Sequence, residues 1–277
     1  MDIVRVPSAV HQQPQLAAGD IAFVDYRDRG GFYRTRVLFD CYAFSFVQNG
    51  QKQIYRATEN TIVTPGYAML ISEGNSIIAE HSNTSALYHS FIVFFPGRLG
   101  REFMLSRPAT PMVKSGVPYV CFKTNTYIQE YVRGVQALIN SQQTISPEMA
   151  ALKVTELLTA VFELEPDLLR RMFEGSPNVS LKALVERNLL NPLTLEELAF
   201  LANRSLSSFK RDFQQAYGVS PQKYIRDRRL EMARAELAAG KLASQLYLDY
   251  GYQHLANFNT AFKRKFGITP ADCRQSA

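Results

Sequence analysis

The chain has 277 residues, of which 46% are hydrophobic and 20% are charged, so it is long enough for two domains and too apolar for an intrinsically disordered protein. It contains no run of about eighteen apolar residues and no apolar signal-peptide core near its start, and we therefore expect neither a transmembrane helix nor an export signal. The net charge of +6 suggests an anionic partner only if the basic residues are clustered.

The basic excess lies in the last part of the chain. Residues 178–277 carry 15 Lys and Arg against 9 Asp and Glu, whereas the preceding residues carry 16 of each. Either these charges are scattered over a soluble surface, or this part of the chain faces a polyanion. Charge alone does not distinguish DNA, RNA and a membrane surface, so the motifs must decide.

The first part of the chain has the pattern of β-structure. Five short segments are rich in Val, Ile, Phe and Tyr and are separated by turn signals. They are Cys41–Val47, Gln53–Ala57, Ala68–Ser72, Ser76–Glu80 and Tyr88–Phe94. Asn49–Gly50 predicts a type I′ hairpin between the first two segments, because that turn needs positive φ at both central residues. Strands at this spacing predict a sandwich or a barrel.

Two helices are expected next, over Tyr127–Ser141 and Pro147–Glu163. The second has a broad apolar face, which is formed by Leu152, Leu157, Leu158, Val161 and Phe162. This face is either buried in the core of its own domain or forms a helix–helix dimer interface, and the spacing does not choose between them. We expect a first domain over residues 1–170, a linker over 171–178 and a second domain over 179–277.

An internal repeat with an offset of 49 residues follows the linker. The segment FKRDFQQAYGVSP, Phe209–Pro221, is repeated as FNTAFKRKFGITP, Phe258–Pro270. In each copy aromatic residues at i, i+4 and i+8 predict the buried stripe of a helix, and the glycine predicts its left-handed end. The Ser-Pro or Thr-Pro that follows predicts the capped start of another helix.

A shorter helix is expected before each copy of the repeat. In the first copy, the capping box Thr194–Glu197 opens this helix, and a break near Asn203–Ser205 separates it from the repeat. In the second copy, Ala243, Leu246 and Tyr247 take the first-helix role and Gly251–Tyr252 forms the turn. Helix, tight turn and helix, twice over, is the helix-turn-helix arrangement. A long helix over Gln222–Ala239 connects the two units.

The face opposite each aromatic stripe carries the residues that we expect to contact DNA. Arg and Lys can donate to guanine, Asn can pair with adenine, and the Thr methyl group can meet that of thymine. A solvated polar face would look similar for any one residue, but two such faces on matching helices favour DNA binding. The candidate DNA-binding residues are Ser207, Ser208, Lys210, Arg211 and Gln214 on the first helix and Asn257, Asn259, Thr260, Lys263 and Arg264 on the second.

These motifs resemble the AraC/XylS family of bacterial transcription regulators. The resemblance covers Leu181–Arg274 and rests on LTLEELAFLA at 193–202, Ser-x-Ser-x-x-x-Arg-x-Phe at 205–213, RRLEMARAEL at 228–237, and the Gly-Tyr to Thr-Pro run at 251–270. It implies an α+β protein with a cupin-like N-terminal β-barrel or sandwich and an all-α double helix-turn-helix domain. Lys153–Leu158 resembles the helical segment through which many members of the family dimerise. The resemblance also implies base contacts from Ser207, Lys210, Arg211, Asn257, Asn259 and Thr260.

The resemblance further implies a cytoplasmic activator that binds double-stranded promoter DNA, contacts RNA polymerase and forms a homodimer. A small-molecule or protein effector is possible within the family, and the chain is most similar to the activators of type III secretion, for which a protein partner can replace a sugar. No cofactor, metal or membrane partner is expected. Three residues of the second unit depart from the family pattern: Tyr247 stands where the family has a small Ala, Thr260 where Arg is frequent, and His254 in place of a usual cap. These departures suggest that the second unit reads bases differently.

Two enzyme classes remain as alternatives: a cupin-type metal enzyme, and a DNA-repair alkyl-acceptor protein with an attached DNA-binding domain. His81 and His89 lack the spacing of metal ligands. The three cysteines are isolated in the sequence, which suits a reducing cytoplasm. None of them has a second cysteine nearby with which to bind zinc, as an alkyl-acceptor cysteine would need. A ligand cavity would need lining from aromatic residues of the strands, which can equally be ordinary core. These residues are Phe44, Phe46, Tyr88 and Phe91.

Overall fold

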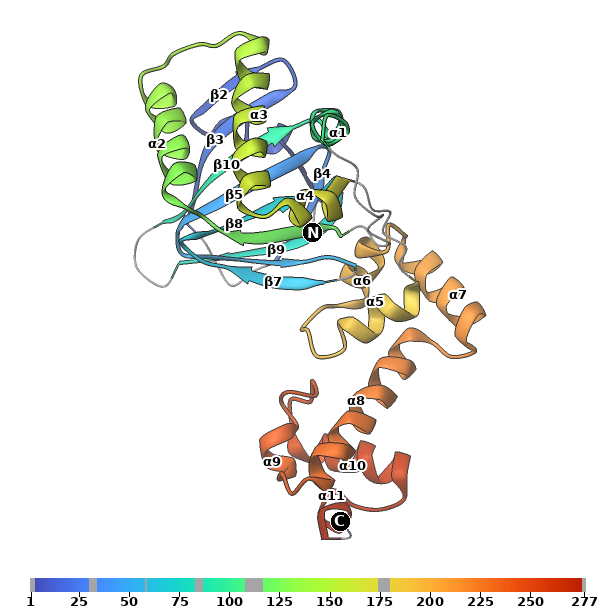
Figure 1. Ribbon diagram of the computed structural model, residues 1–277. Helices are drawn as coiled ribbons and strands as arrows, with labels where there is room; N and C mark the ends of the chain where they lie inside the picture. The colour runs from blue at the N-terminus through green and yellow to red at the C-terminus, as the bar shows by residue number, and fades with distance from the viewer. Residues whose placement is uncertain are drawn as a thin grey trace. The chain divides into compact units, whose positions relative to one another are not determined.

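The computed structural model describes residues 3–29, 34–57, 59–82, 87–107, 117–173 and 180–275. The chain divides into two compact units, Met1–Asn178 and Val179–Ala277, of which the first contains every strand of the described residues and the second is helical (Figure 1). The protein is therefore of the α+β class. No helix within the described ranges is long and apolar enough to cross a membrane.

The N-terminal unit is built on two sheets. In spatial order, the first consists of β1 (Ile3–Val6), β4 (Thr35–Phe39), β9 (Gly74–His81), β6 (Gln51–Tyr55) and β7 (Asn60–Val63). The second consists of β11 (Tyr119–Lys123), β8 (Tyr67–Ile71), β5 (Tyr42–Asn49), β10 (Tyr88–Phe95), β3 (Ile21–Asp28) and β2 (Gln15–Ala18). Neighbouring strands are antiparallel except for the parallel pair β1–β4. Among the described residues no strand pairs across the two sheets, which form a sandwich rather than a closed barrel.

The five strands predicted from the sequence are all present, as β5, β6, β8, β9 and β10, with ends displaced by up to two residues. Their alternating apolar residues enter one core shared by both sheets. Phe44, Phe46, Tyr88 and Phe91 are buried in that core. The core alternative is thus correct for these four aromatic side chains.

The hairpin predicted at Asn49–Gly50 is wrong. β5 pairs with β8 and β10, while the following strand, β6, pairs with β7 and β9 in the other sheet. Only Gly50 has positive φ, +82°, and a Cβ placed there would lie 2.3 Å from the carbonyl oxygen of His81. The glycine lets the chain pass this carbonyl as it crosses from one sheet to the other. The chain therefore does turn at Asn49–Gly50, but the two strands that flank this position do not pair with each other.

Four helices belong to the N-terminal unit: α1 (Gly97–Leu105), α2 (Thr126–Asn140), α3 (Pro147–Leu164) and α4 (Pro166–Phe173). α2 and α3 match the two predicted helices and pack on β2 and β3 (Figure 1). α4 continues to Phe173 and buries Leu168, Leu169 and Met172. The predicted linker, 171–178, therefore begins too early, and its residues from 174 onwards lie outside the described ranges.

The apolar face of α3 is largely internal. Leu157, Leu158 and Val161 are fully buried in the core of the N-terminal unit, and Phe162 is half-buried against it, whereas 62% of Leu152 is exposed. Burial in its own domain is thus the correct alternative for most of this face. Only its N-terminal part, around Leu152, is left for a partner.

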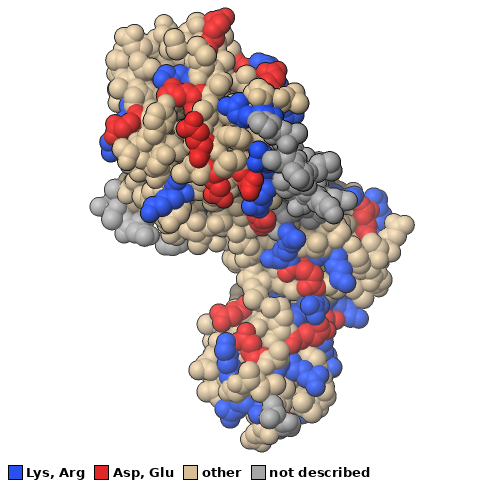
Figure 2. Space-filling view, viewed as in Figure 1, with Lys and Arg blue, Asp and Glu red and all other residues tan. Residues whose placement is uncertain are grey.

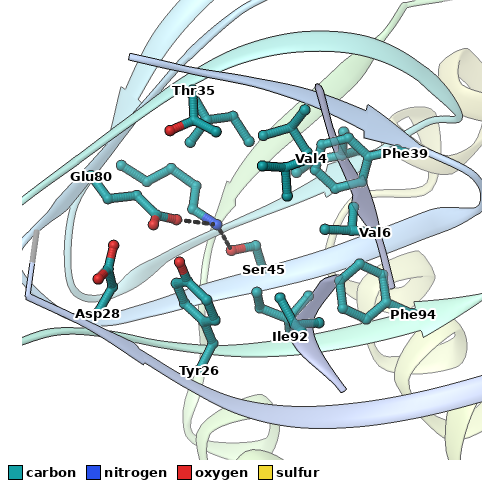
Figure 3. A pocket seen from close by; sticks show the side chains of 15 residues that line it. Val4, Val6, Tyr26, Asp28, Thr35, Phe39, Ser45, Glu80, Ile92 and Phe94 are labelled. Carbon is teal, nitrogen blue, oxygen red and sulfur yellow. Dashed lines mark hydrogen bonds and ion pairs between the residues drawn. The ribbon is translucent and has the colours of Figure 1, made fainter. Parts of the chain in front are cut away.

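A cavity of about 280 Å³ lies between the two sheets (Figure 3). Its walls come from β1, the short 3₁₀ helix η1 (Ser8–Val10) and strands of both sheets. None of the four aromatic residues proposed from the sequence lines it. The cavity is therefore a feature that only the packing of the two sheets creates.

The C-terminal unit contains α5 (Leu181–Arg187), α6 (Leu195–Leu201), α7 (Leu206–Tyr217), α8 (Pro221–Ala238), α9 (Ala243–Leu246), α10 (Leu255–Phe266) and α11 (Pro270–Gln275). α8 is the predicted connector. One of its faces, Leu230, Ala233 and Leu237, is buried against α9, α10 and α11.

Candidate nucleic-acid interface

The first helix-turn-helix unit consists of α6 and α7, as predicted. The capping box is formed: the Thr194 N–H donates to Glu197 Oε2 at 2.7 Å, and the Glu197 N–H donates to Thr194 Oγ1 at 3.2 Å. The turn passes through Asn203, whose φ is +55°, a conformation that asparagine tolerates better than most residues. Ser205 Oγ then accepts from the Ser208 N–H at 3.2 Å and starts α7. Local hydrogen bonds thus set the direction of α7.

The second unit has a matching second helix but a different first one. α9 has only four residues, and Tyr247, predicted to belong to it, is its half-buried C-cap. The turn before α10 contains Gly251, whose φ is +81°. His254 precedes α10 without a side-chain capping bond, in contrast to Ser205 before α7. The unusual residues seen at 247 and 254 in the sequence therefore lie where the two units differ.

The aromatic stripes of α7 and α10 have nearly the same geometry. The ring centroids of Phe209 and Phe213 are 6.1 Å apart and those of Phe258 and Phe262 are 5.9 Å apart, and all four side chains are fully buried. Gly218 and Gly267 end the two helices with φ of +73° and +76°. The repeat in sequence is therefore a repeat in structure, and each stripe fixes which face of its helix is left outside.

Ser220 and Thr269 start the helices that follow the repeats, as predicted. Ser220 Oγ accepts from the Lys223 N–H at 3.3 Å at the start of α8. Thr269 Oγ1 accepts from the Asp272 N–H at 3.2 Å, and the Asp272 carboxylate accepts from the Thr269 N–H at 3.0 Å.

All ten residues predicted to face DNA lie on α7 or α10. Eight of them are exposed, and Ser208 and Lys210 are half-buried. The exposed residues are Ser207, Arg211 and Gln214 on α7 and Asn257, Asn259, Thr260, Lys263 and Arg264 on α10. The 100° spacing of a helix was thus sufficient to identify the outer faces.

Five of the ten residues already have intramolecular partners, and two of them, Ser207 and Ser208, share hydroxyl hydrogen bonds with Ser205 at 3.1 and 3.0 Å. Arg211 Nε donates to Asp212 Oδ1 at 3.2 Å, Gln214 Nε2 donates to the Gly218 carbonyl at 2.9 Å, and Thr260 Oγ1 donates to the Ala256 carbonyl at 2.9 Å. The side chains of Gln214 and Thr260 therefore each use a hydrogen-bond donor on a nearby backbone carbonyl. Arg211 keeps its two terminal nitrogens, and the bond through Nε restrains the direction of its guanidinium.

Sequence reasoning missed Asp212 and Arg204. The Asp212 carboxylate is shared between Arg211 and Arg204, which lies in the turn before α7. Helical spacing does not reveal such a pair, because Arg204 is outside the helix.

The basic residues of the two helices differ in how they are paired. No ion pair within the described ranges involves Lys210, Lys263 or Arg264. Lys265, by contrast, is bound to Glu231 of α8 at 2.8 Å and to the Asp227 carbonyl. Figure 2 shows Lys and Arg at several places on the visible face of the C-terminal unit, with Asp and Glu between them. The basic excess is therefore distributed, and Lys263 and Arg264 are the unpaired cations of α10.

Metal-binding groups and cysteine reactivity are the two features that the rival enzyme classes require. No group of three or more His, Cys, Asp and Glu side chains in the described part of the chain could hold a metal ion. Burial and the carboxylates of Glu73 and Asp40 raise the pKa of Cys41 to about 12, and burial raises the pKa of Cys121 to about 11. An alkyl-acceptor cysteine needs a lowered pKa, so both shifts are in the wrong direction for that chemistry.

Comparison with known families covers both units. Residues 198–276 match the family described as a helix-turn-helix domain, and residues 42–171 match the family described as the ExsA N-terminal regulatory domain.

Three characterised relatives are similar to the chain. ExsA, an HTH-type transcriptional regulator of Pseudomonas aeruginosa, is 25% identical over 224 residues, which cover 77% of this chain and 78% of ExsA. The XylDLEGF operon transcriptional activator 3 of Pseudomonas putida is 32% identical over 139 residues, 48% of this chain and 41% of that protein. The thermoregulatory protein LcrF of Yersinia pestis is 25% identical over 162 residues, 57% of this chain and 59% of LcrF. The chain thus matches less than half the length of the XylDLEGF activator.

Proposed function

The chain belongs to the AraC/XylS family of DNA-binding transcription regulators, and we propose on this basis that it activates transcription from promoters whose sequence it reads with α7 and α10. The observation that carries the proposal is the structural repeat: two helices with matching buried stripes, each with a polar outer face. An α-helix fits the major groove of B-DNA, where each base pair presents a distinct set of donors and acceptors.

In this proposal the ten outer-face residues divide the recognition between the units. Arg211 donates its two terminal nitrogens to guanine, while Lys210 and Ser207 contact the same groove segment. Asn257 and Asn259 meet adenine in the second segment, and Lys263 and Arg264 neutralise phosphates. With α8 as the connector, successive groove segments on one DNA face are about 34 Å apart.

We assign regulation to the N-terminal unit, which we propose is cupin-like and acts as a binding unit rather than as an enzyme. The cavity between its sheets would take an effector. Homodimerisation would use the exposed start of α3, where 47% of Met149 and 62% of Leu152 are exposed on neighbouring turns. Contact with RNA polymerase and a cytoplasmic location complete the proposal.

The test is selection of binding sites from fragments of the source genome by the full chain, followed by gel shift of the recovered DNA. We expect a common sequence in the recovered fragments, and binding that weakens steeply as salt rises, because neutralised phosphates release counterions. Recovery of unrelated fragments, bound equally well at moderate salt, would mean that the chain lacks sequence-specific function.

A promoter fused to a reporter then tests activation. The wild-type chain should raise reporter output from the selected site, and a chain that carries Arg211→Ala should not. The matched control is Arg5→Ala, which removes an exposed arginine, one that is paired with Asp40 in the N-terminal unit. Repression by the wild-type chain would contradict the activator assignment while leaving DNA binding intact.

A further inference from the structure

The cavity between the two sheets has one polar and one apolar end. Figure 3 shows Asp28, Glu80 and Tyr26 at one end, and Val6, Phe39 and Phe94 at the other. The polar end comes from β3, β5, β6 and β9, and the apolar end from β1, β4 and β10. Two sheets thus enclose a space suited to an amphipathic molecule rather than to a uniformly polar or apolar one.

A buried ion pair forms the polar end. Lys52 is 2% exposed, and its Nζ lies 3.3 Å from Glu80 Oε1 and donates to Ser45 Oγ at 2.9 Å. Removing an ammonium and a carboxylate from water is expensive, and uncharged side chains could close this end of the sandwich at a smaller desolvation penalty. The pair is therefore hard to explain as a device for stability alone.

The charges at this end do not balance. Among the lining residues of the cavity, Lys52 is the one cation, whereas Asp28 and Glu80 are both anions. The single positive charge is already paired with Glu80, and Asp28 accepts a hydrogen bond from a backbone group, the Arg29 N–H, at 2.7 Å. The cavity end therefore keeps an excess negative charge, carried by a carboxylate with an oxygen to spare.

From this imbalance we propose that the cavity binds a small amphipathic amine. Its protonated amino group lies between the carboxylates of Asp28 and Glu80, where it completes the charge balance with Lys52. Its apolar body lies against Phe39, Phe94 and the valines of β1. A carboxylate ligand of the same shape would bring a third anion to one cation, and is excluded by repulsion.

This assignment rests on the proposed function, in which the cavity holds the effector, and its test is kept separate from DNA binding. The full chain is titrated in a calorimeter with 2-phenylethylamine, 2-phenylethanol and 3-phenylpropanoate, which share an aromatic body and differ in the charge of the head. We expect saturable 1:1 binding of the amine, weaker binding of the alcohol and no binding of the carboxylate.

Two matched variants locate the binding site. Asp28→Asn removes the unbalanced carboxylate at a half-buried position that should fold normally, and should weaken amine binding about tenfold or more. Asp40→Asn removes an exposed carboxylate that does not line the cavity, and should leave amine binding unchanged. Unfolding midpoints of both variants establish that they are folded.

Each other result overturns the assignment. Equal affinity for the amine and the carboxylate, wild-type amine affinity in Asp28→Asn, or no saturable binding at millimolar amine would each reject a cationic ligand. The same preparations are tested for gel shift of the selected promoter fragment. DNA binding without amine binding would reject the amine as ligand and leave the proposed regulator function standing. Amine binding without DNA binding would reject the proposed regulator function and leave the amine site standing.

Discussion

The Nε of Arg229 donates to the backbone carbonyl of Leu189 at 2.6 Å and joins the connector α8 to the segment that follows α5. The same guanidinium lies beside the turn of the second helix-turn-helix unit: a Cβ placed on Gly251 would lie 2.5 Å from Nη1 of Arg229. One side chain on α8 therefore contacts the segment that follows α5 and lies beside the turn of the second helix-turn-helix unit. Its position depends on residue 251 having no side chain.

Gly251→Ala should destabilise the protein more than Gly267→Ala. Both glycines have positive φ, +81° and +76°, and an alanine in that conformation costs about 1–2 kcal/mol at either position. A Cβ at Gly267 meets no atom within 4 Å, whereas one at Gly251 displaces Arg229 from Leu189 and loses about 1 kcal/mol more. Urea unfolding of the two variants measures the difference. Equal losses would show that Arg229 moves aside freely.

Arg211→Ala should weaken binding to the selected site by about 1–3 kcal/mol, because a bidentate contact to guanine is lost. The loss should be confined to one base position, so that the variant no longer distinguishes guanine there. Gel shifts against single-base variants of the site measure this, with Arg5→Ala as the control. An equal loss on every sequence would make Arg211 a phosphate contact instead.

The two reading helices should contribute unequally to specificity. α7 presents Arg211 and Lys210, whose long side chains span a groove, whereas Thr260 on α10 is short and donates to its own backbone. We expect mismatches in the half-site of α7 to cost about 1–3 kcal/mol each, and those in the half-site of α10 to cost less. Selection from random DNA measures the information content of each half-site. Two half-sites of equal content, about ten base pairs apart, would refute this asymmetry.

Lys263 and Arg264 should act as phosphate contacts. Replacement of either with alanine should weaken binding to all sequences alike and reduce the salt dependence of binding by about one unit. Lys265 is excluded from this role because it is bound to Glu231, so Lys265→Ala should act on stability first. Affinity measured over a series of salt concentrations separates the two effects. A change of base preference in Lys263→Ala would contradict the assignment.

Leu152→Glu should convert a dimer of the full chain to a monomer. A carboxylate at this exposed position on α3 would be buried without a partner in a helix–helix interface. The control is Leu105→Glu on α1, where the side chain is 85% exposed and a carboxylate stays in water. Sedimentation at tens of micromolar distinguishes the two states. A monomeric wild-type chain under these conditions would remove α3 as a dimer interface.

Asp25→Asn should destabilise the N-terminal unit at neutral pH and have a smaller effect in acid. Burial acts to raise the pKa of Asp25, but hydrogen bonds from His89 at 2.8 Å and Gln136 at 2.6 Å, with the charge of Arg27, hold the pKa below its ordinary value. A lowered folded-state pKa stabilises the fold above the unfolded value, about 3.9, and that stability is lost as pH falls through the folded value.

The expected loss for Asp25→Asn is about 1–3 kcal/mol at pH 7, since the hydrogen bonds involve a charged acceptor. The difference from wild type should narrow as pH falls below about 4, because the carboxylate is then protonated in the unfolded chain and, below its lowered pKa, in the folded protein as well. Urea unfolding at the two pH values measures both quantities. Asp20→Asn, which removes an exposed ion pair with Arg98, serves as the control and should change stability little. A difference that is constant with pH would show that Asp25 acts through shape and not charge.

Much of the C-terminal unit could be predicted from its amino acids alone, because its signals are local. The Thr194–Glu197 box, the Ser220 cap and the glycines at 218 and 267 each act within one or two turns of helix. The aromatic spacing of each repeat then defines a buried face and, by subtraction, an outer one. Every residue predicted to face DNA was found on α7 or α10 for this reason.

Long-range packing decided what local patterns left open. Asn49–Gly50 indicated a turn, but the sequence did not indicate the sheet to which β6 belongs. Pairing of β6 with β7 and β9 decided this. The leucines of α3 were equally suited to a core or a partner until the sheet covered them. Lys52 and Glu80 meet only because β6 pairs with β9, and Arg229 reaches Leu189 across 40 residues. Turns, caps and helix faces follow from neighbours in the chain, whereas cavities, ion pairs between strands and contacts between distant helices and loops exist only after distant segments have packed.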